Sequence, residues 1–147
     1  LDSSYRRVEM RVPSWVDPFY LAEEPYDVSL RTTPGGMLRV VDVPGALRSM
    51  RRPERAACFT LCVTDPVLPE NNGTFRVVLD GKEAEVERAE TAAPDLSTDV
   101  QTLTQLVCGS HSPEQLLQSG ANLTVTGNLE TLSRVFTPRP IHMVEGF

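Results

Sequence analysis

The order of two hydrophobic patterns along the chain constrains the fold more than any other feature of the sequence. Between residues 28 and 88, short runs rich in β-branched residues are separated by turn signals, which predicts strands. Between residues 98 and 136, apolar residues instead recur every three or four positions, which predicts helices. Strands followed by helices are typical of an α+β fold, in which helices pack on one face of a mostly antiparallel sheet.

The predicted strands are short and lie next to turn signals. They cover residues 28–32, 37–43, 57–64, 74–79, 82–89 and 123–126. Asp80-Gly81 is typical of a two-residue hairpin, which here joins the fourth and fifth of these strands. The alternating Glu83, Glu85 and Glu87 indicate that the strand after this hairpin is a solvated edge of the sheet.

The predicted helices are marked by residues that begin or end helices. A short helix over residues 43–50 places Pro44 in its first turn. Thr98-Asp99-Val100-Gln101 reads as a capping box for a helix that ends at Gly109. A further helix begins at Ser112-Pro113 and ends at Gly120, and the last covers about Asn128–Phe136.

The first 27 residues differ from the rest of the chain. They hold most of its aromatic residues, among prolines and without a helical or strand period, so we expect an extended arm with at most one short helix. A chain of 147 residues is the size of one domain. Because it begins with Leu1 rather than methionine, we also expect a piece of a longer protein.

Charge and cysteine content narrow the possible partners and compartment. The formal net charge of −6 disfavours nucleic acid, whose phosphates need a basic surface. No apolar run is long enough to span a membrane. Cys58, Cys62 and Cys108 show no zinc-like spacing, and we interpret them as buried small hydrophobic residues, with a reactive thiol as the alternative. The reducing cytoplasm is the expected compartment.

The residues by themselves predict no catalytic constellation. His111 and His142 are isolated and have neither metal-ligand nor catalytic-triad spacing. Asp95 and Asp99 flank a predicted helix start, where acidic residues favour the helix dipole, so a structural role is the better interpretation. No glycine-rich phosphate loop and no acetyl-CoA pyrophosphate loop is present, and no metal site is expected.

Several segments nevertheless resemble motifs of one known domain, and they follow one another in the same order as in that domain. It is the C-terminal sterol-carrier-protein-like domain of the enhanced intracellular survival family of GNAT N-acetyltransferases. The matching segments are Met37–Leu47 (L-x-R-[VI]-x-D-[VI]-x-x-A-L), Val63–Pro66 (V-x-D-P), Asn72–Val77 (N-x-G-x-[WF]-x-[LV]), Asp95–Leu103 with Gly109, and Phe136 with Phe147. The resemblance implies this domain over residues 28–147, and the end of a preceding acetyltransferase-like region with its linker over residues 1–27.

The resemblance also implies a function. Members of that family transfer acetyl groups to amines, including aminoglycosides and lysine side chains, and bind acetyl-CoA in a region that is absent here. This chain would therefore bind no cofactor itself, and would be inactive alone. Its partners would be the N-terminal acetyltransferase region of the same polypeptide and a cationic amine substrate, and the full protein would form homo-oligomers.

In that family the final carboxylate acts as the general base, which implies this role for the α-carboxylate of Phe147. Where the family often has an aromatic residue and a cysteine shortly before its end, this chain has Ile141 to Gly146. Glu145 and His142 are therefore candidates for modifying the site. The negative net charge fits a cationic substrate.

A second hypothesis stays open, in which the chain is a stand-alone sterol-carrier-like module that binds a lipid or another apolar ligand. The β-branched residues Val40, Val77 and Val78 would fill the space that such a ligand needs.

Overall fold

A computed structural model describes residues 9–13, 16–20, 25–31, 36–81 and 83–140 of the chain. The chain divides into two compact units, one made of residues 37–139 and the other of residues 1–36 and 140–147. Among its described residues, the second unit contains two single turns of 3-10 helix, Pro18–Tyr20 and Pro25–Asp27, where at most one short helix was expected. Residues 37–139 contain the sheet and its covering helices.

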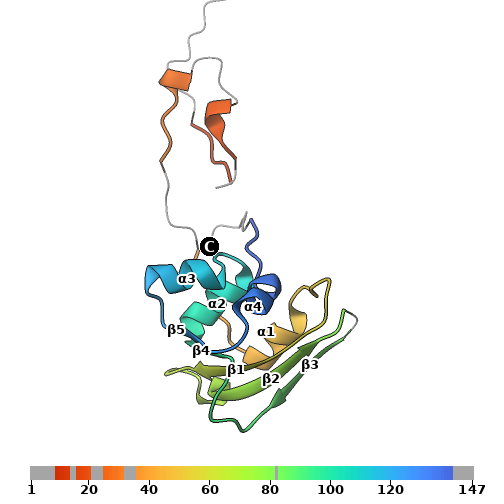
Figure 1. Cartoon of the computed structure of the whole chain (residues 1–147). Coiled ribbons are helices and arrows are strands. Elements are labelled where there is room, and N and C mark those ends of the chain that lie inside the picture. The colour runs from red at the N-terminus through yellow and green to blue at the C-terminus, as the bar shows by residue number, and fades with distance from the viewer. Residues whose placement is uncertain (1–8, 14–15, 21–24, 32–35, 82, 141–147) are drawn as a thin grey trace, which may run out of the picture. The chain divides into compact units, whose positions relative to one another are not determined.

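A five-stranded sheet forms the base of the larger unit (Figure 1). Its strands are β1 (Ala57–Thr64), β2 (Gly73–Leu79), β3 (Ala84–Arg88), β4 (Leu96–Asp99) and β5 (Leu123–Val125). They lie in the order β3-β2-β1-β4-β5, and only the β1–β4 pair is parallel. The mostly antiparallel sheet is confirmed.

Four helices cover one face of this sheet, which confirms the α+β fold (Figure 1). They are α1 (Val43–Ser49), α2 (Val100–Cys108), α3 (Pro113–Ser119) and α4 (Leu129–Val135). Alternate residues of β1 are buried, as expected for a strand with one covered face. Phe59 of β1 packs edge-on against Phe136 at the end of α4, with 5.8 Å between ring centroids.

Side-chain caps explain where the helices begin. The Asp42 carboxylate accepts the Gly45 N–H and starts α1, with Pro44 in the first turn as predicted. Ser112 and Gln115 form the capping box of α3. Each capping side chain satisfies one of the four N–H groups that the first turn of its helix leaves unpaired.

The capping box predicted for α2 is wrong in one position. Asp99, not Thr98, caps this helix and accepts the Thr102 N–H at 2.7 Å. Thr98 belongs to β4, where its hydroxyl donates to the Asn122 carbonyl. The predicted end at Gly109 is confirmed, because Gly109 adopts the left-handed conformation that closes the helix.

Two predicted strands are wrong and one strand was missed. Residues 28–31 and 37–42 are irregular, although they carry β-rich sequence. Side chains take the place of a strand partner for the second segment: the Val40 N–H donates to Thr104 Oγ1, and Asn71 Nδ2 donates to the Val41 carbonyl. The missed strand is β4, whose four residues alternate too briefly to show a period.

The predicted hairpin and edge strand are present, but the loop is longer than expected. Leu79 pairs with Ala84, so residues 80–83 connect β2 to β3 instead of two residues. The Glu83 N–H donates to the Asp80 carboxylate within this loop. β3 is an outer strand of the sheet, and Glu85 and Glu87 on it are exposed as predicted.

The cysteines are free thiols, and none of them is fully buried, so the expected burial is wrong. Cys58 is exposed, whereas Cys62 and Cys108 are half-buried. Cys58 and Cys62 do lie on one face of β1, as their even spacing requires, but it is the face away from the buried residues. No helix among the described residues is long and apolar enough to cross a membrane.

Candidate functional site

Asp65 lies directly after β1 and carries a buried carboxylate, with 3% of the residue exposed. This carboxylate accepts four hydrogen bonds: from Arg39 Nη2 (2.5 Å), the Val67 N–H (2.9 Å), the Leu68 N–H (3.0 Å) and Asn71 Nδ2 (2.9 Å). Because the only formal cation in this set is a half-buried guanidinium, the backbone and amide donors do much of the charge stabilisation.

These contacts determine the protonation state of Asp65. Burial alone would raise the pKa of this carboxyl group, but the hydrogen bonds from Asn71, Leu68, Val67 and Arg39 together hold its pKa well below its usual range. Asp65 is therefore ionised at neutral pH. A carboxylate whose pKa lies so low is a poor general base and serves as a structural anion.

Two asparagines extend this network to the segment before α1. Asn71 is 1% exposed, and its Oδ1 accepts the Val43 N–H at 3.1 Å. Asn72 Oδ1 accepts the Asp65 N–H at 2.7 Å. The network thus joins residues 39–43 to the connection between β1 and β2. Arg39, Asp65 and Asn72 belong to segments on which the family resemblance was based, so these motif residues hold the fold together.

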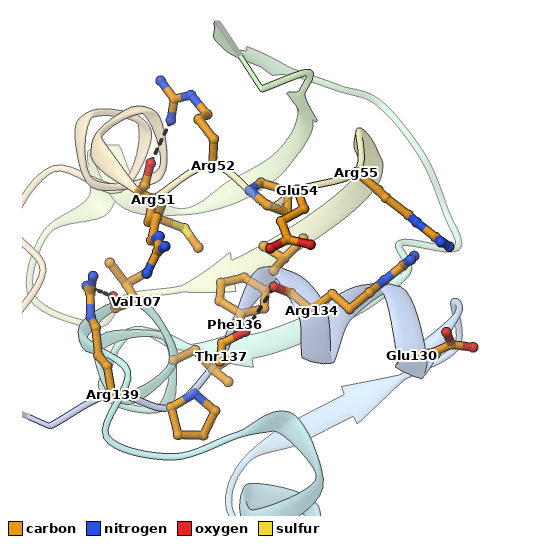
Figure 2. A pocket seen from close by; sticks show the side chains of 15 residues that line it. Arg51, Arg52, Glu54, Arg55, Val107, Glu130, Arg134, Phe136, Thr137 and Arg139 are labelled. Carbon is orange, nitrogen blue, oxygen red and sulfur yellow. Dashed lines mark hydrogen bonds between the residues drawn. The ribbon is translucent and has the colours of Figure 1, made fainter.

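A cavity of about 580 Å³ is bounded by the connection between α1 and β1, by α2, and by α4 with the residues that follow it (Figure 2). Arginines dominate its charged lining. The lining residues are Met50, Arg51, Arg52, Pro53, Glu54, Arg55, Leu106, Val107, Glu130, Arg134, Val135, Phe136, Thr137, Pro138 and Arg139. We refer to this space as the arginine cavity. Five arginines against two glutamates make its formal charge +3.

Hydrogen bonds hold some of these arginines in place. Arg139 donates from Nε to the Cys108 carbonyl at 3.2 Å and from Nη2 to the Val107 carbonyl at 2.9 Å. Arg52 Nη1 donates to the Met50 carbonyl at 2.7 Å. Within the described part of the chain, none of the five arginines forms an ion pair. The cavity therefore presents a net positive charge, even though Glu54 and Glu130 also line it.

The residues proposed for catalysis belong to the end of the chain, for which no positions are described. Phe147, Glu145 and His142 lie outside the described residues, so their role stays a prediction. His111 is exposed, and its Nδ1 lies 3.0 Å from Ser110 Oγ.

The structural interpretation of the two aspartates is confirmed. Asp95 Oδ2 accepts hydrogen bonds from the Thr60 N–H and hydroxyl at 2.7 and 2.8 Å and ties β1 to the start of β4. Asp99 caps α2. No group of three potential metal-ligating side chains occurs among the residues whose positions are described.

The arginine cavity was missed at the level of the sequence. Residues 51–55 read only as a charged loop, and Arg134 and Arg139 lie some 80 positions later, in a different predicted helix and its tail. The available signal was local: two adjacent arginines and a third within five residues, in a chain of net negative charge. Only the packing of α4 beside the α1–β1 connection combines the two groups.

Comparison with known families identifies the domain. The family described as a sterol carrier protein domain matches residues 43–144. This range begins at the first residue of α1 and includes the whole sheet. Among curated proteins, no sequence matches this chain.

Solved structures with the same fold are larger proteins. Eis1 from Mycobacterium abscessus has 25% sequence identity and a TM-score of 0.57 over 69% of this chain and 25% of its own. A GCN5-related N-acetyltransferase from Anabaena variabilis has 26% identity and a TM-score of 0.60 over 69% of this chain and 26% of its own.

A probable N-acyltransferase from Enterococcus faecalis has 24% identity and a TM-score of 0.69 over 84% of this chain and 31% of its own, which supports the fold. This chain thus spans between a quarter and a third of the length of these proteins.

Proposed function

Because the chain belongs to the sterol carrier protein domain family, we propose that it is the sterol-carrier-like domain of a GNAT N-acetyltransferase. The similarity to Eis1 and to the Anabaena variabilis acetyltransferase carries this proposal, since both contain the fold within a longer chain. The domain would form part of the wall of the substrate cleft. Acetyl-CoA would bind in the N-terminal region of the same polypeptide.

In this proposal the α-carboxylate of Phe147 is the general base for the transfer of an acetyl group to an amine. It would accept the proton that the amine loses as its nitrogen attacks the thioester carbonyl. A terminal carboxylate has an ordinary pKa of about 3.5, so it is ionised at neutral pH and needs a desolvated position to become a stronger base. Glu145 and His142 are close enough in sequence to modify that environment.

The described residues give less support to a lipid-binding role. A carrier of sterols or fatty acids needs an apolar cavity, and such cavities are lined mainly by hydrophobic side chains. Here leucine, valine and phenylalanine side chains fill the core between helices and sheet, including Phe75, Leu103 and Leu132. The arginine cavity has a mixed lining, in which apolar residues stand beside five arginines, so it is not the mainly apolar cavity that a lipid needs.

The decisive experiment uses the full-length protein and alters the position of the terminal carboxylate without removing a side chain. One glycine is added after Phe147, and kcat is measured with acetyl-CoA and a panel of amines. We expect kcat to fall by about 10²–10⁴-fold, the usual contribution of general acid–base catalysis. The matched control, Phe147→Leu, keeps the carboxylate in place and should retain most of the activity.

Two results would contradict the proposal. Equal kcat in the wild type and the extended variant would exclude the carboxylate as the base. No acetyl transfer by the full-length protein to any amine in the panel would exclude the acetyltransferase assignment, and native mass spectrometry of the purified protein would then show whether a lipid is bound.

A further inference from the structure

About a third of the basic residues of this chain line one cavity. The sequence has fourteen lysine and arginine residues and a formal net charge of −6. Five of the fourteen line the arginine cavity, and among the described residues none of these five is paired with a carboxylate. Gathering like charges costs electrostatic energy, which an anionic ligand would recover.

The arrangement of the guanidinium groups suits a shared anion. Figure 2 shows Arg51 and Arg139 pointing toward each other from different segments, and Arg55 and Arg134 doing the same elsewhere in the lining. Arg139 is held by two backbone carbonyls, so ordering it for a ligand costs little entropy. Its remaining N–H donors have no partner among the described residues.

Arg52, which lines the same cavity, is held at one nitrogen of its guanidinium group. Its Nε is buried and has no hydrogen-bond acceptor, whereas its Nη1 is held by the carbonyls of Arg48 and Met50. Leaving a buried donor unpaired costs about 1–3 kcal/mol, and more for a charged group. Because this Nε is not exposed, an acceptor bound in the cavity would reach it only after the Arg52 side chain moves.

From these observations we propose that the arginine cavity binds a small phosphorylated molecule. A phosphate monoester carries a charge of about −1.5 to −2 at neutral pH and three acceptor oxygens, which matches several guanidinium groups better than one carboxylate does. A volume of about 580 Å³ accommodates a small organic ligand. The apolar lining residues Pro53, Val107 and Pro138 would contact its organic part.

This ligand differs from the substrate of the proposed acetyl transfer. The amine expected there is cationic and would be repelled by a lining of formal charge +3. The phosphorylated ligand therefore has a site of its own, and its binding can be tested without any measurement of acetyl transfer.

Phenyl phosphate is a suitable probe, and isothermal titration calorimetry of the chain measures its affinity. We expect saturable binding at pH 7.5. Phenyl sulfate and benzoate, which are monoanions carrying the same ring, should bind about tenfold more weakly or worse. Because the second phosphate pKa is about 6, affinity for phenyl phosphate should fall between pH 7.5 and pH 5.5, whereas affinity for phenyl sulfate should not.

Substitutions locate the site. Arg51→Gln and Arg55→Gln remove charges from side chains that hydrogen-bond to nothing in the described chain, so both variants should fold normally. Each should weaken phenyl phosphate binding by about tenfold. Arg76→Gln removes an equal charge from the exposed face of β2 and is the matched control. Glu54→Gln removes a competing carboxylate from the lining and should strengthen binding.

The proposal is overturned if phenyl phosphate shows no saturable binding at millimolar concentrations. It is also overturned if Arg76→Gln weakens binding as much as Arg55→Gln does, because the affinity would then reflect overall charge. Preference for benzoate over phenyl phosphate would replace the phosphorylated ligand by a carboxylate and equally reject it.

Discussion

Asp65 shows how one residue can combine two unfavourable properties and still stabilise the protein. It is both buried and ionised, and its four donors come from Arg39, Asn71 and two backbone N–H groups. Replacing only one partner leaves a charge with incomplete compensation. The network as a whole is therefore the unit that stabilises the fold.

The low pKa of Asp65 predicts how stability depends on pH. The unfolded chain has the ordinary value of 3.8, and the folded state lies below it, so the stabilisation is complete above this value. As pH falls below 3.8, the unfolded state takes up a proton before the folded state does, and the free energy of unfolding decreases. In Asp65→Asn this acid-induced loss should be smaller, although the variant is less stable at neutral pH.

Urea unfolding at a series of pH values measures this effect. Glu90→Gln removes an exposed carboxylate and is the matched control, with an acid profile close to that of the wild type. An unchanged profile in Asp65→Asn would show that the carboxyl group titrates alike in the folded and unfolded states.

At the residue scale, the sequence identified several important positions without their partners. The resemblance singled out segments containing Arg39 and Asp65, but their ion pair spans 26 positions and needs the folded chain. The even spacing of Cys58 and Cys62 correctly predicted one shared face of β1. Which face is covered depends on the helices, so the predicted burial of Cys58 was wrong.

At the scale of elements, the sequence predicted those strands and helix ends whose structure depends on nearby residues alone. β1 and the glycine ends of α2 and α3 were predicted because alternation and left-handed caps are local properties. The strand predicted over residues 37–43 is absent, because the structure of residues 37–42 depends on distant residues. Their β-rich composition is overridden by hydrogen bonds to Thr104 and Asn71, which are distant in sequence.

The two glycine caps offer a matched pair of substitutions. Both have left-handed backbones, with φ of 75° at Gly109 and 72° at Gly120. At Gly120 a new Cβ meets nothing within 4 Å, so Gly120→Ala should cost only about 1 kcal/mol of backbone strain. At Gly109 it would lie 2.6 Å from Arg139 Cγ, so Gly109→Ala should cost roughly 2 kcal/mol or more.

Chemical denaturation gives both free energies of unfolding. Only Gly109→Ala should also weaken phenyl phosphate binding, because Arg139 lines the arginine cavity. Equal destabilisation in the two variants would mean that the Arg139 side chain moves away from the new methyl group at no cost.

At the scale of the whole molecule, the sequence predicted the class of fold and the family but not the distribution of charge. The α+β arrangement follows from the order of strand and helix patterns, and the sterol carrier protein domain is confirmed over residues 43–144. The net charge of −6 favoured a cationic partner. The net charge is a sum over the whole chain and does not show where the charges lie. A cavity of formal charge +3 is therefore compatible with a chain of net negative charge.

The central position of β1 in the sheet determines the order in which the strands unfold locally. β1 hydrogen-bonds to β2 on one side and β4 on the other, whereas β3 and β5 have one neighbour each. The β1–β2–β3 meander forms from nearby segments, but the parallel β1–β4 contact must first close a long loop, which makes it the slower step. Transient opening should therefore begin at the two outer strands and reach β1 last.

Native-state hydrogen exchange tests this order of opening. Amides of Phe59, Leu61 and Val63, which lie in the middle of the sheet, should exchange most slowly, near the rate set by global unfolding. Amides of β3 and β5 should exchange faster by local opening. Equal protection in all five strands would instead make the sheet a single cooperative unit that forms and is lost as a whole.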